Sequence, residues 1–276
     1  MNILIVDGNE KDASSKYTEI GMPTQYEVYE KVLKNLLNKD YKLTTLHPAC
    51  KDNYIPNGLS LDDFDGIVWT GSLLNIYDLG PSIERQIELA KELFNKENKI
   101  FGSCWGLQVL ATAAGGTVKK NPKGLEAVIA KNITVNEEGS KHPLYINKPR
   151  VFDSFCWHYD EVANLPNDVK VLSSNEFSSI QSIAFLRGKS EIWAVQYHPE
   201  FDSKWISGLM KQRESLLLKE GIYDNIKYFK RLSSFLSNTK KNINLKNNLL
   251  ISDTLINIEI HTLEIANWLK NLKNDI

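Results

Sequence analysis

Short apolar runs alternate with amphipathic stretches along the first hundred residues of the chain. Runs of strand length occupy positions 2–6, 41–46, 67–70 and 99–103. Stretches with apolar side chains at helical spacing lie among them, at positions 26–38 and 82–95. The β-α-β-α-β order predicts an α/β fold, in which helices flank a doubly wound, mostly parallel sheet with right-handed crossovers.

The ends of these predicted strands carry residues of chemical interest. Asp7, Gly71 and Cys104 each follow such an end, and ligands of doubly wound sheets bind at the carboxyl ends of the strands. The segment 8–25 leaves the first strand at the same edge and is predicted as a long loop. Loops of that length usually have a function or are disordered, so this one either covers the site or is a surface insertion.

The pattern changes after residue 118. Five β-rich runs separated by Asn, Pro and Gly predict additional, partly antiparallel strands on the same domain, near positions 126–135, 150–156, 168–173, 179–187 and 191–197.

Helical patterns return near the C-terminal end. We expect helices over 202–221, 224–235 and most of 251–272, with a polar loop at 237–248. About 65 residues of amphipathic helix have little core of their own. The predicted organisation is therefore a catalytic domain over 1–210 and a helical extension over 211–276, packed on that domain or on a partner.

The most informative motif is the octet 101–108, F-G-S-C-W-G-L-Q, in which a strand pattern passes into a helical one. Gly-x-Cys-x-Gly at such a junction is the thiol version of the nucleophile elbow. Gly102 and Gly106 remove Cβ atoms that would collide across the sharp turn. The N-terminus of the following helix favours the thiolate of Cys104. Taken alone, the motif also fits a buried cysteine at a tight strand–helix contact.

A second motif, Q-Y-H-P-E, closes the β-rich run at 192–200. Pro199 favours an extended backbone at His198, and in extended chain the side chains of His198 and Glu200 project to the same side. Alone, the motif also fits a strand end with a loop-capping histidine and a solvated glutamate. Together with the elbow, it predicts a nucleophile, base and orienter: Cys104, His198 and Glu200.

These two motifs resemble those of class I glutamine amidotransferases, which include the glutaminase domains of GMP synthetase, anthranilate synthase and carbamoyl-phosphate synthetase. Segment 66–72 resembles the strand and glycine turn of that family, and W-H-Y-D-E-V at 157–162 resembles its S-H-G-D-x-V segment. The resemblance covers about residues 1–210. It implies a flavodoxin-like amidotransferase fold in a stand-alone chain that is similar to the glutaminase domain of GMP synthetase.

The resemblance also implies a reaction and a set of site residues. Cys104 attacks the side-chain amide of glutamine, and His198 moves the protons. Backbone N–H groups near Gly71 and Trp105 form the oxyanion hole. The expected contacts to glutamine come from Gln108, Trp157, His158 and Tyr159.

The sequence departs from the family pattern at the glycine turn. Thr70-Gly71-Ser72 stands where many members have G-G-P or G-P-G, so the oxyanion turn keeps one glycine. His158 is a rival for the base, but His198 has its own carboxylate neighbour. Trp157 also differs from the GMP synthetase domains and argues against membership in that enzyme.

Composition narrows the remaining choices. The 276 residues have a formal net charge of −1, which gives no reason to expect nucleic acid or membrane binding. The N-terminal apolar run is too short for a signal peptide. Three widely spaced cysteines fit a reducing cytoplasm and lack metal-site spacing. We therefore expect a cytoplasmic enzyme without metal or cofactor.

Three functions remain open at this level. The first is a glutaminase that passes ammonia to a separate synthetase, because no nucleotide-binding P-loop motif occurs in the chain. The second is a hydrolase of γ-glutamyl compounds with the same triad. The third is a binding or regulatory protein that kept the fold without the chemistry, and the intact Cys104, His198 and Glu200 argue against it.

Overall fold

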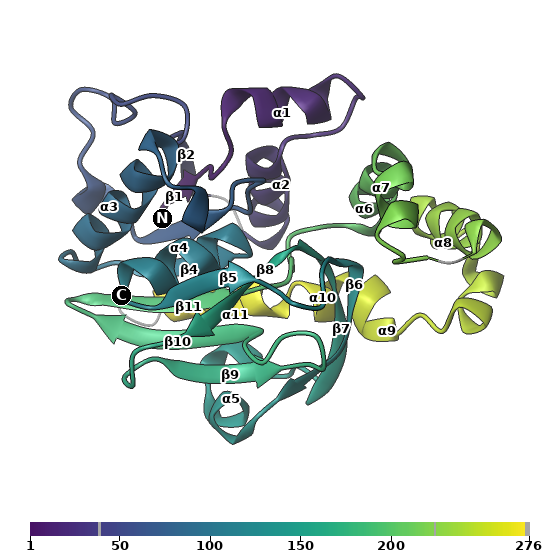
Figure 1. Ribbon diagram of the computed structural model, residues 1–276. Coiled ribbons are helices and arrows are strands. Elements are labelled where there is room, and N and C mark those ends of the chain that lie inside the picture. Colours follow the sequence, from purple (N-terminus) through teal and green to yellow (C-terminus); the bar gives the residue numbers. More distant parts are fainter. Residues whose placement is uncertain (38–39, 224, 274–276) are drawn as a thin grey trace.

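A nine-stranded sheet forms the centre of the computed structural model, which describes residues 1–37, 40–223 and 225–273 (Figure 1). The strand order is β2-β1-β3-β4-β11-β10-β9-β6-β7. Neighbours from β2 to β11 pair in parallel, and those from β11 to β7 pair antiparallel. The strands are β1 Asn2–Val6, β2 Lys42–Leu46, β3 Gly66–Trp69, β4 Lys99–Ser103, β6 Glu126–Val135, β7 Val151–His158, β9 Lys170–Ser174, β10 Ser182–Arg187 and β11 Ser190–Val195. The predicted α/β class is confirmed.

Helices cover both faces of the parallel half of this sheet. Because neighbouring side chains of a strand point to opposite faces, Ile3 and Ile5 contact one helical layer, whereas Leu4 and Val6 contact the other. The first layer contains α2 (Gln25–Leu36) and α11 (Leu263–Lys273), and the second contains α3 (Pro81–Phe94) and α4 (Trp105–Ala113).

Two strands were missed by the sequence analysis. Within the described residues, β5 (Thr117–Lys120) and β8 (Asp160–Asn164) pair as a separate antiparallel ribbon. Both are short and largely polar, so neither produces an apolar run. The prediction of a structureless segment at 8–25 is also wrong, because this segment contains α1 (Lys11–Thr18). Tyr17 is its only buried residue, so the sequence of α1 carries no apolar repeat.

The C-terminal helices are more divided than the pattern predicts. The stretch 202–221 forms α6 (Ser203–Gln212) and α7 (Glu214–Lys219), separated at Arg213. The predicted loop at 237–248 contains two short 3-10 turns. Residue 224, at the predicted start of the next helix, and residue 38, at the predicted end of the first, lie outside the described residues. The remaining helices are α5 Glu137–Lys141, α8 Ile226–Ser237, α9 Asp253–Ile256 and α10 Ile258–His261.

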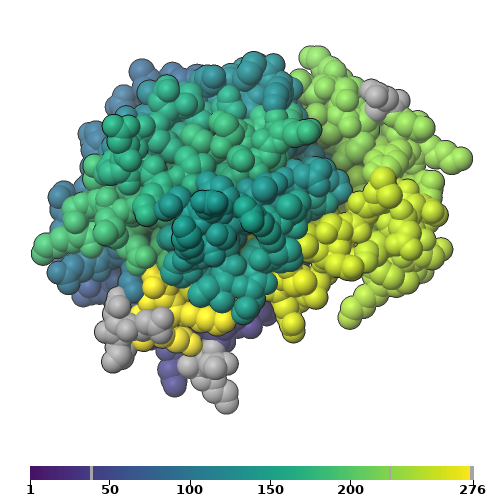
Figure 2. Space-filling model, turned by 90° about the horizontal axis from the view of Figure 1, so that it is seen from below, coloured from purple at the N-terminus to yellow at the C-terminus, as the bar shows by residue number. Residues whose placement is uncertain are grey.

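The final helix returns to the sheet. α6 and α8 form a separate apolar cluster with β6 and β7. α11 packs in one cluster with β1, β3 and β4, and Figure 1 shows it as a yellow helix behind β11. In Figure 2 the C-terminal helices up to residue 273 form a yellow band along the underside of the molecule. A fully buried ion pair between Lys148 and Glu264, 2.8 Å long, fixes the start of α11.

Candidate active site

Cys104 occupies a strained turn between β4 and α4. Its backbone angles are φ 51° and ψ −101°, a region that non-glycine residues rarely adopt. Hydrogen bonds hold this turn on both sides: the Cys104 amide donates to the Val195 carbonyl at 2.7 Å, and its carbonyl accepts from the Gln108 amide at 3.1 Å. The predicted elbow is therefore present, and it raises the side chain at the carboxyl end of β4.

The two glycines of the motif are required by contact. A Cβ on Gly102 would lie 2.8 Å from the carbonyl carbon of Gly106. A Cβ on Gly106 would lie 2.8 Å from the Trp69 carbonyl oxygen. Both separations are closer than carbon atoms tolerate, so the elbow keeps its shape only with glycine at these two positions.

His198 follows the end of β11, the strand beside β4. Its backbone amide donates to the Phe155 carbonyl at 2.8 Å, and its imidazole Nδ1 lies 2.6 Å from Oε1 of Glu200. The ring also stacks on Phe201, with 3.9 Å between the ring centres and 7° between the planes. Both His198 and Glu200 are buried. Nδ1 is thus occupied, which leaves Nε2 for chemistry.

Glu200 has a second set of partners that the sequence analysis missed. Its Oε2 accepts a hydrogen bond from the Ser103 hydroxyl at 3.0 Å, and Ser103 in turn is hydrogen-bonded to the hydroxyl of Tyr29 on α2. Because Ser103 directly precedes Cys104, the carboxylate is fixed relative to the elbow itself. No local pattern reveals this link, since Tyr29 lies on a different element.

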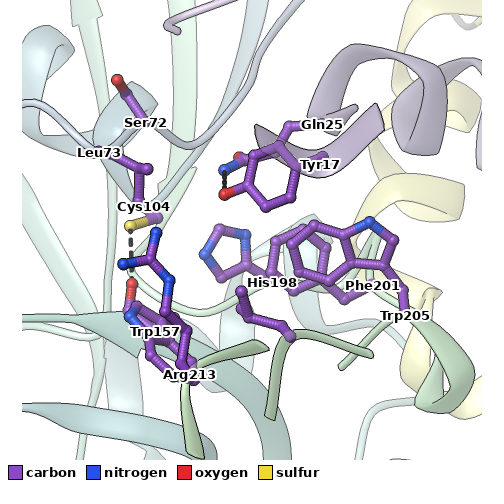
Figure 3. Close-up of a pocket in the computed structure, with 11 residues that line it drawn as sticks. Tyr17, Gln25, Ser72, Leu73, Cys104, Trp157, His198, Phe201, Trp205 and Arg213 are labelled. Carbon is purple, nitrogen blue, oxygen red and sulfur yellow. Dashed lines mark hydrogen bonds between the residues drawn. The ribbon is translucent and has the colours of Figure 1, made fainter. Parts of the chain in front are cut away.

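Two adjoining cavities meet at Cys104. The smaller one, about 20 Å³, is lined by Cys104 and His198 together (Figure 3). The larger one, about 340 Å³, lies toward β7 and β8. The structure therefore brings the thiol and the imidazole to the same cavity, although 94 positions separate residues 104 and 198 in sequence. The smaller cavity has room for about one water-sized molecule.

The ionisation of Cys104 runs against the expectation from the helix N-terminus. Burial raises the pKa of its thiol, and the nearby Glu200 carboxylate raises it further. The Trp105 backbone N–H acts in the opposite direction and is outweighed. The net shift of the thiol pKa is therefore opposite to the direction expected from the helix N-terminus alone. The thiol instead donates to the Trp157 carbonyl at 3.8 Å.

The two residues predicted for the oxyanion hole both lie beside this centre. A Cβ on Gly71 would lie 2.8 Å from Cε1 of His198, so only glycine leaves room for the imidazole. The Gly71 carbonyl accepts from Asn9 Nδ2 at 3.0 Å and from the Thr70 hydroxyl at 2.8 Å, which fixes the turn. The Trp105 backbone N–H is oriented toward Cys104, as its effect on the thiol shows. Their role as donors stays a prediction.

The residues predicted to contact substrate gather at the larger cavity. With Cys104, its lining includes Gln108, Trp157, His158 and Tyr159.

His158 is not free to act as a base. Its Nδ1 lies 2.9 Å from the Asp160 carbonyl oxygen, and its Nε2 lies 2.8 Å from Oε2 of Glu126. With both ring nitrogens occupied, His158 braces β7 against β6. This geometry supports the choice of His198 over His158.

Three lining residues had no signal in the sequence. Tyr17 on α1 and Gln25 at the start of α2 close one side of the smaller cavity, and Gln25 Nε2 donates to the Tyr17 hydroxyl at 3.3 Å. The segment 8–25 thus covers the site, which is one of the two alternatives predicted for it. Arg213, from the junction of α6 and α7, lines both cavities.

Candidate metal ligands and thiols outside the two cavities are dispersed in the part of the chain that the structure describes. Among these residues, no three His, Cys, Asp or Glu side chains gather into a metal-binding group. Cys50 and Cys156 are free thiols away from either cavity. No helix of the described chain has the length and apolarity needed to cross a bilayer.

The fold and the cysteine turn define an α/β protein with a strand–elbow–helix site at the carboxyl ends of its parallel strands. Residues 25–210 match the family model described as glutamine amidotransferase class-I. The chain belongs to this family and is an enzyme of its amide-hydrolase type.

Individual relatives extend this comparison. A γ-glutamyl-L-1-hydroxyisopropylamide hydrolase from a Pseudomonas species is 32% identical over 99% of this chain and 93% of its own length. γ-Glutamyl peptidase 4 of Arabidopsis thaliana is 29% identical over 55% of this chain, and the match spans 59% of that peptidase. A glutamine-hydrolysing GMP synthase component of Methanobrevibacter smithii is 27% identical over 53% of this chain and 72% of its own length.

A solved structure agrees in fold. The chain resembles a glutamine amidotransferase from Thermotoga maritima with a TM-score of 0.68 at 17% identity, and the match covers 99% of this chain and 97% of the other. The likeness therefore includes the C-terminal helices as well as the sheet.

Proposed function

We propose that this protein hydrolyses the γ-amide bond of γ-glutamyl amides through Cys104, His198 and Glu200. The observation that carries the proposal is the meeting of Cys104 and His198 at one cavity, with Glu200 hydrogen-bonded to the far side of the imidazole. This is the arrangement of nucleophile, base and orienter used in acyl transfer.

The first half of the reaction forms a thioester. The Cys104 thiol gives its proton to Nε2 of His198 as sulfur attacks the amide carbon, because burial raises the pKa of the thiol and a base must accept its proton. Backbone N–H groups at Gly71 and Trp105 stabilise the oxyanion, each by about 3 kcal/mol. His198 then protonates the departing nitrogen, the carbon–nitrogen bond breaks, and a γ-glutamyl thioester remains.

The second half consumes water. His198 takes a proton from a water molecule as its oxygen attacks the thioester carbon. The carbon–sulfur bond breaks, Cys104 recovers the proton from the imidazolium, and glutamate leaves. Glu200 stabilises the imidazolium, and its hydrogen bond to Nδ1 holds the ring in a single tautomer.

One observation favours a small organic amine as the leaving group: the relative that matches nearly the whole chain is named as a hydrolase of a γ-glutamyl hydroxyalkylamide. The cavity beside His198, closed by Tyr17 and Trp205, is about 20 Å³ and has the size of an ammonia molecule, so it favours glutamine instead. Glutamine, whose leaving group is ammonia, is the second candidate substrate. The similarity to a glutamine-hydrolysing GMP synthase component supports that alternative, with ammonia passing to a partner synthetase.

A substrate comparison tests the proposal. The purified chain is assayed for glutamate release from glutamine, a γ-glutamyl alkylamide and a γ-glutamyl dipeptide. We expect turnover of the alkylamide, and Cys104→Ser should lower it at least about 1,000-fold. The matched control is Cys50→Ser, an exposed thiol outside both cavities, which should leave the rate unchanged. Retention of most activity by Cys104→Ser would refute the mechanism. Strong turnover of glutamine alone would favour the glutaminase.

A further inference from the structure

Arg213 lies between α6 and α7 and contributes to both cavities beside the proposed nucleophile. Figure 3 shows its side chain extending from this junction toward Cys104. The family match ends at residue 210, so Arg213 comes from the C-terminal helices. Cys104 and His198 therefore come from the part of the chain that matches the family, and the positive charge of Arg213 comes from the C-terminal helices.

The guanidinium of Arg213 has no protein counter-ion in the described residues. Arg85 pairs with Asp52 at 2.6 Å and Arg187 pairs with Asp168 at 3.0 Å. A half-buried charge without a counter-ion carries a desolvation cost. A ligand of opposite charge recovers part of that cost, and arginine presents a planar fork that fits a carboxylate.

The backbone holds this cation in place. The Arg213 amide donates to the Leu209 carbonyl at 2.9 Å, and its carbonyl accepts from the Leu217 amide at 2.9 Å. The neighbouring Gln212 side chain donates to the Lys16 carbonyl on α1 at 3.1 Å. The junction is thus hydrogen-bonded to α1, the helix that carries Tyr17. The backbone of Arg213 therefore has a fixed position beside the site.

Charges of both signs surround the larger cavity. Arg213 and Lys16 contribute positive charge, and Asp160, whose Oδ1 accepts a hydrogen bond from the Tyr77 hydroxyl at 2.9 Å, contributes negative charge. A free amino-acid head group has a carboxylate and an ammonium on one carbon. The cavity therefore offers a partner to each, and Cys104, which also lines it, can meet the reacting amide.

We propose that Arg213 binds the α-carboxylate of the γ-glutamyl group and restricts the enzyme to amides that carry this carboxylate. The inference rests on the proposed function, because it assumes that the substrate reaches Cys104 through the larger cavity. In this scheme Arg213 determines specificity for the γ-glutamyl part of the substrate. It does not contact the amine that is released on the His198 side.

Two substrates distinguish recognition of the α-carboxylate by Arg213 from a general effect of Arg213 on activity. Steady-state kinetics compare a γ-glutamyl alkylamide with the same amide of 4-aminobutyrate, which lacks only the α-carboxylate. Arg213→Gln should lower kcat/KM for the first substrate about 10- to 100-fold, mainly through KM. The second substrate should be poor for the wild type and lose nothing more in the variant. Arg213→Lys should recover part of the loss, since it keeps the charge without the fork.

The control for lost positive charge is Lys219→Gln, an exposed α7 residue outside both cavities, which should behave as wild type. Equal losses by Arg213→Gln on both substrates would overturn the inference. A loss confined to γ-glutamyl amides whose leaving amine carries its own carboxylate would also overturn the inference. Arg213 would then bind the carboxylate of the leaving amine and not the α-carboxylate of the γ-glutamyl group.

A binding measurement keeps the two proposals distinguishable. Calorimetry of glutamate and of 4-aminobutyrate is carried out on Cys104→Ser and on Cys104→Ser with Arg213→Gln. Weaker glutamate binding in the double variant, with 4-aminobutyrate binding unchanged, supports the carboxylate site even if the catalytic proposal fails. Unchanged glutamate binding refutes the role of Arg213 even if hydrolysis through Cys104 is established.

Discussion

The imidazole of His198 lies flat against the ring of Phe201, with 3.9 Å between the ring centres and 7° between the planes. Glu200 fixes the same imidazole in a second direction through Nδ1. The ring can therefore neither tilt nor rotate without losing one of these contacts, which pre-organises Nε2 before substrate arrives.

The stack leads to the first prediction. Phe201→Leu keeps an apolar side chain but removes the flat contact, so we expect kcat to fall about 10-fold or more with little change in KM. The control is Phe185→Leu, a buried phenylalanine that packs on Phe94 away from the site. Steady-state kinetics and thermal melting of both variants separate orientation from stability. Equal kinetic losses in the two would show that the stack has no special role.

Glu200→Gln should cost less than Cys104→Ser. The glutamine side chain still reaches Nδ1 but does not stabilise the imidazolium by charge, and an orienter usually matters less than a nucleophile, by roughly 100-fold. Single-turnover rates of acyl-enzyme formation provide the measurement. If Glu200→Gln and Cys104→Ser lowered this rate equally, the Glu200 carboxylate would take part in the chemistry itself and would not only orient the imidazole.

The buried thiol leads to a pH prediction. Burial and the Glu200 carboxylate raise the pKa of Cys104, so its thiolate fraction at any pH is lower than that of an ordinary cysteine, whose pKa is about 8.5. Thiolate absorbance of the free enzyme should therefore show no Cys104 step below about pH 8. The difference between Cys50→Ser and the Cys50→Ser, Cys104→Ser double variant isolates this thiol. A step below about pH 7 would restore the expectation from the helix N-terminus.

The contact between α11 and the sheet leads to a stability prediction. A Cβ on Gly66 would lie 2.6 Å from Cδ1 of Leu272 and 2.8 Å from Cζ2 of Trp268. Gly66→Ala should therefore lower the free energy of unfolding by about 1–3 kcal/mol in urea titrations. Leu272→Ala makes room for the added methyl, so the double variant should lose less than the sum of the two single losses. If the loss in the free energy of unfolding of the double variant equalled the sum of the two single losses, α11 would not be held in contact with β3.

Much of the fold could be predicted from the sequence because buried strands and amphipathic helices leave periodic patterns. The predicted strands at 2–6 and 99–103 match β1 and β4 residue for residue. The patterns fail where burial is sparse. In α1 only Tyr17 is buried, and β5 and β8 form one largely polar ribbon, so none of the three was predicted.

The site divides in the same way. Cys104 lies in a local motif, because the glycines that permit its strained turn are only two residues away on either side. His198 and Glu200 lie two residues apart on extended chain. By contrast, Tyr17, Gln25 and Arg213 reach the cavities from elements that meet only in the folded molecule. No pattern within their own segments distinguishes them from surface residues.

The sequence by itself determined the individual strands of the parallel sheet, the cysteine turn and the pairing of His198 with Glu200, because each depends on side chains close together along the chain. The tertiary structure decided which helix covers each face of the sheet, how α1 and Arg213 enclose the site, and the direction in which the pKa of Cys104 shifts. These depend on packing and burial between distant segments. Burial raises the pKa of the thiol because removing solvent disfavours the anion more strongly than the Trp105 backbone N–H favours it.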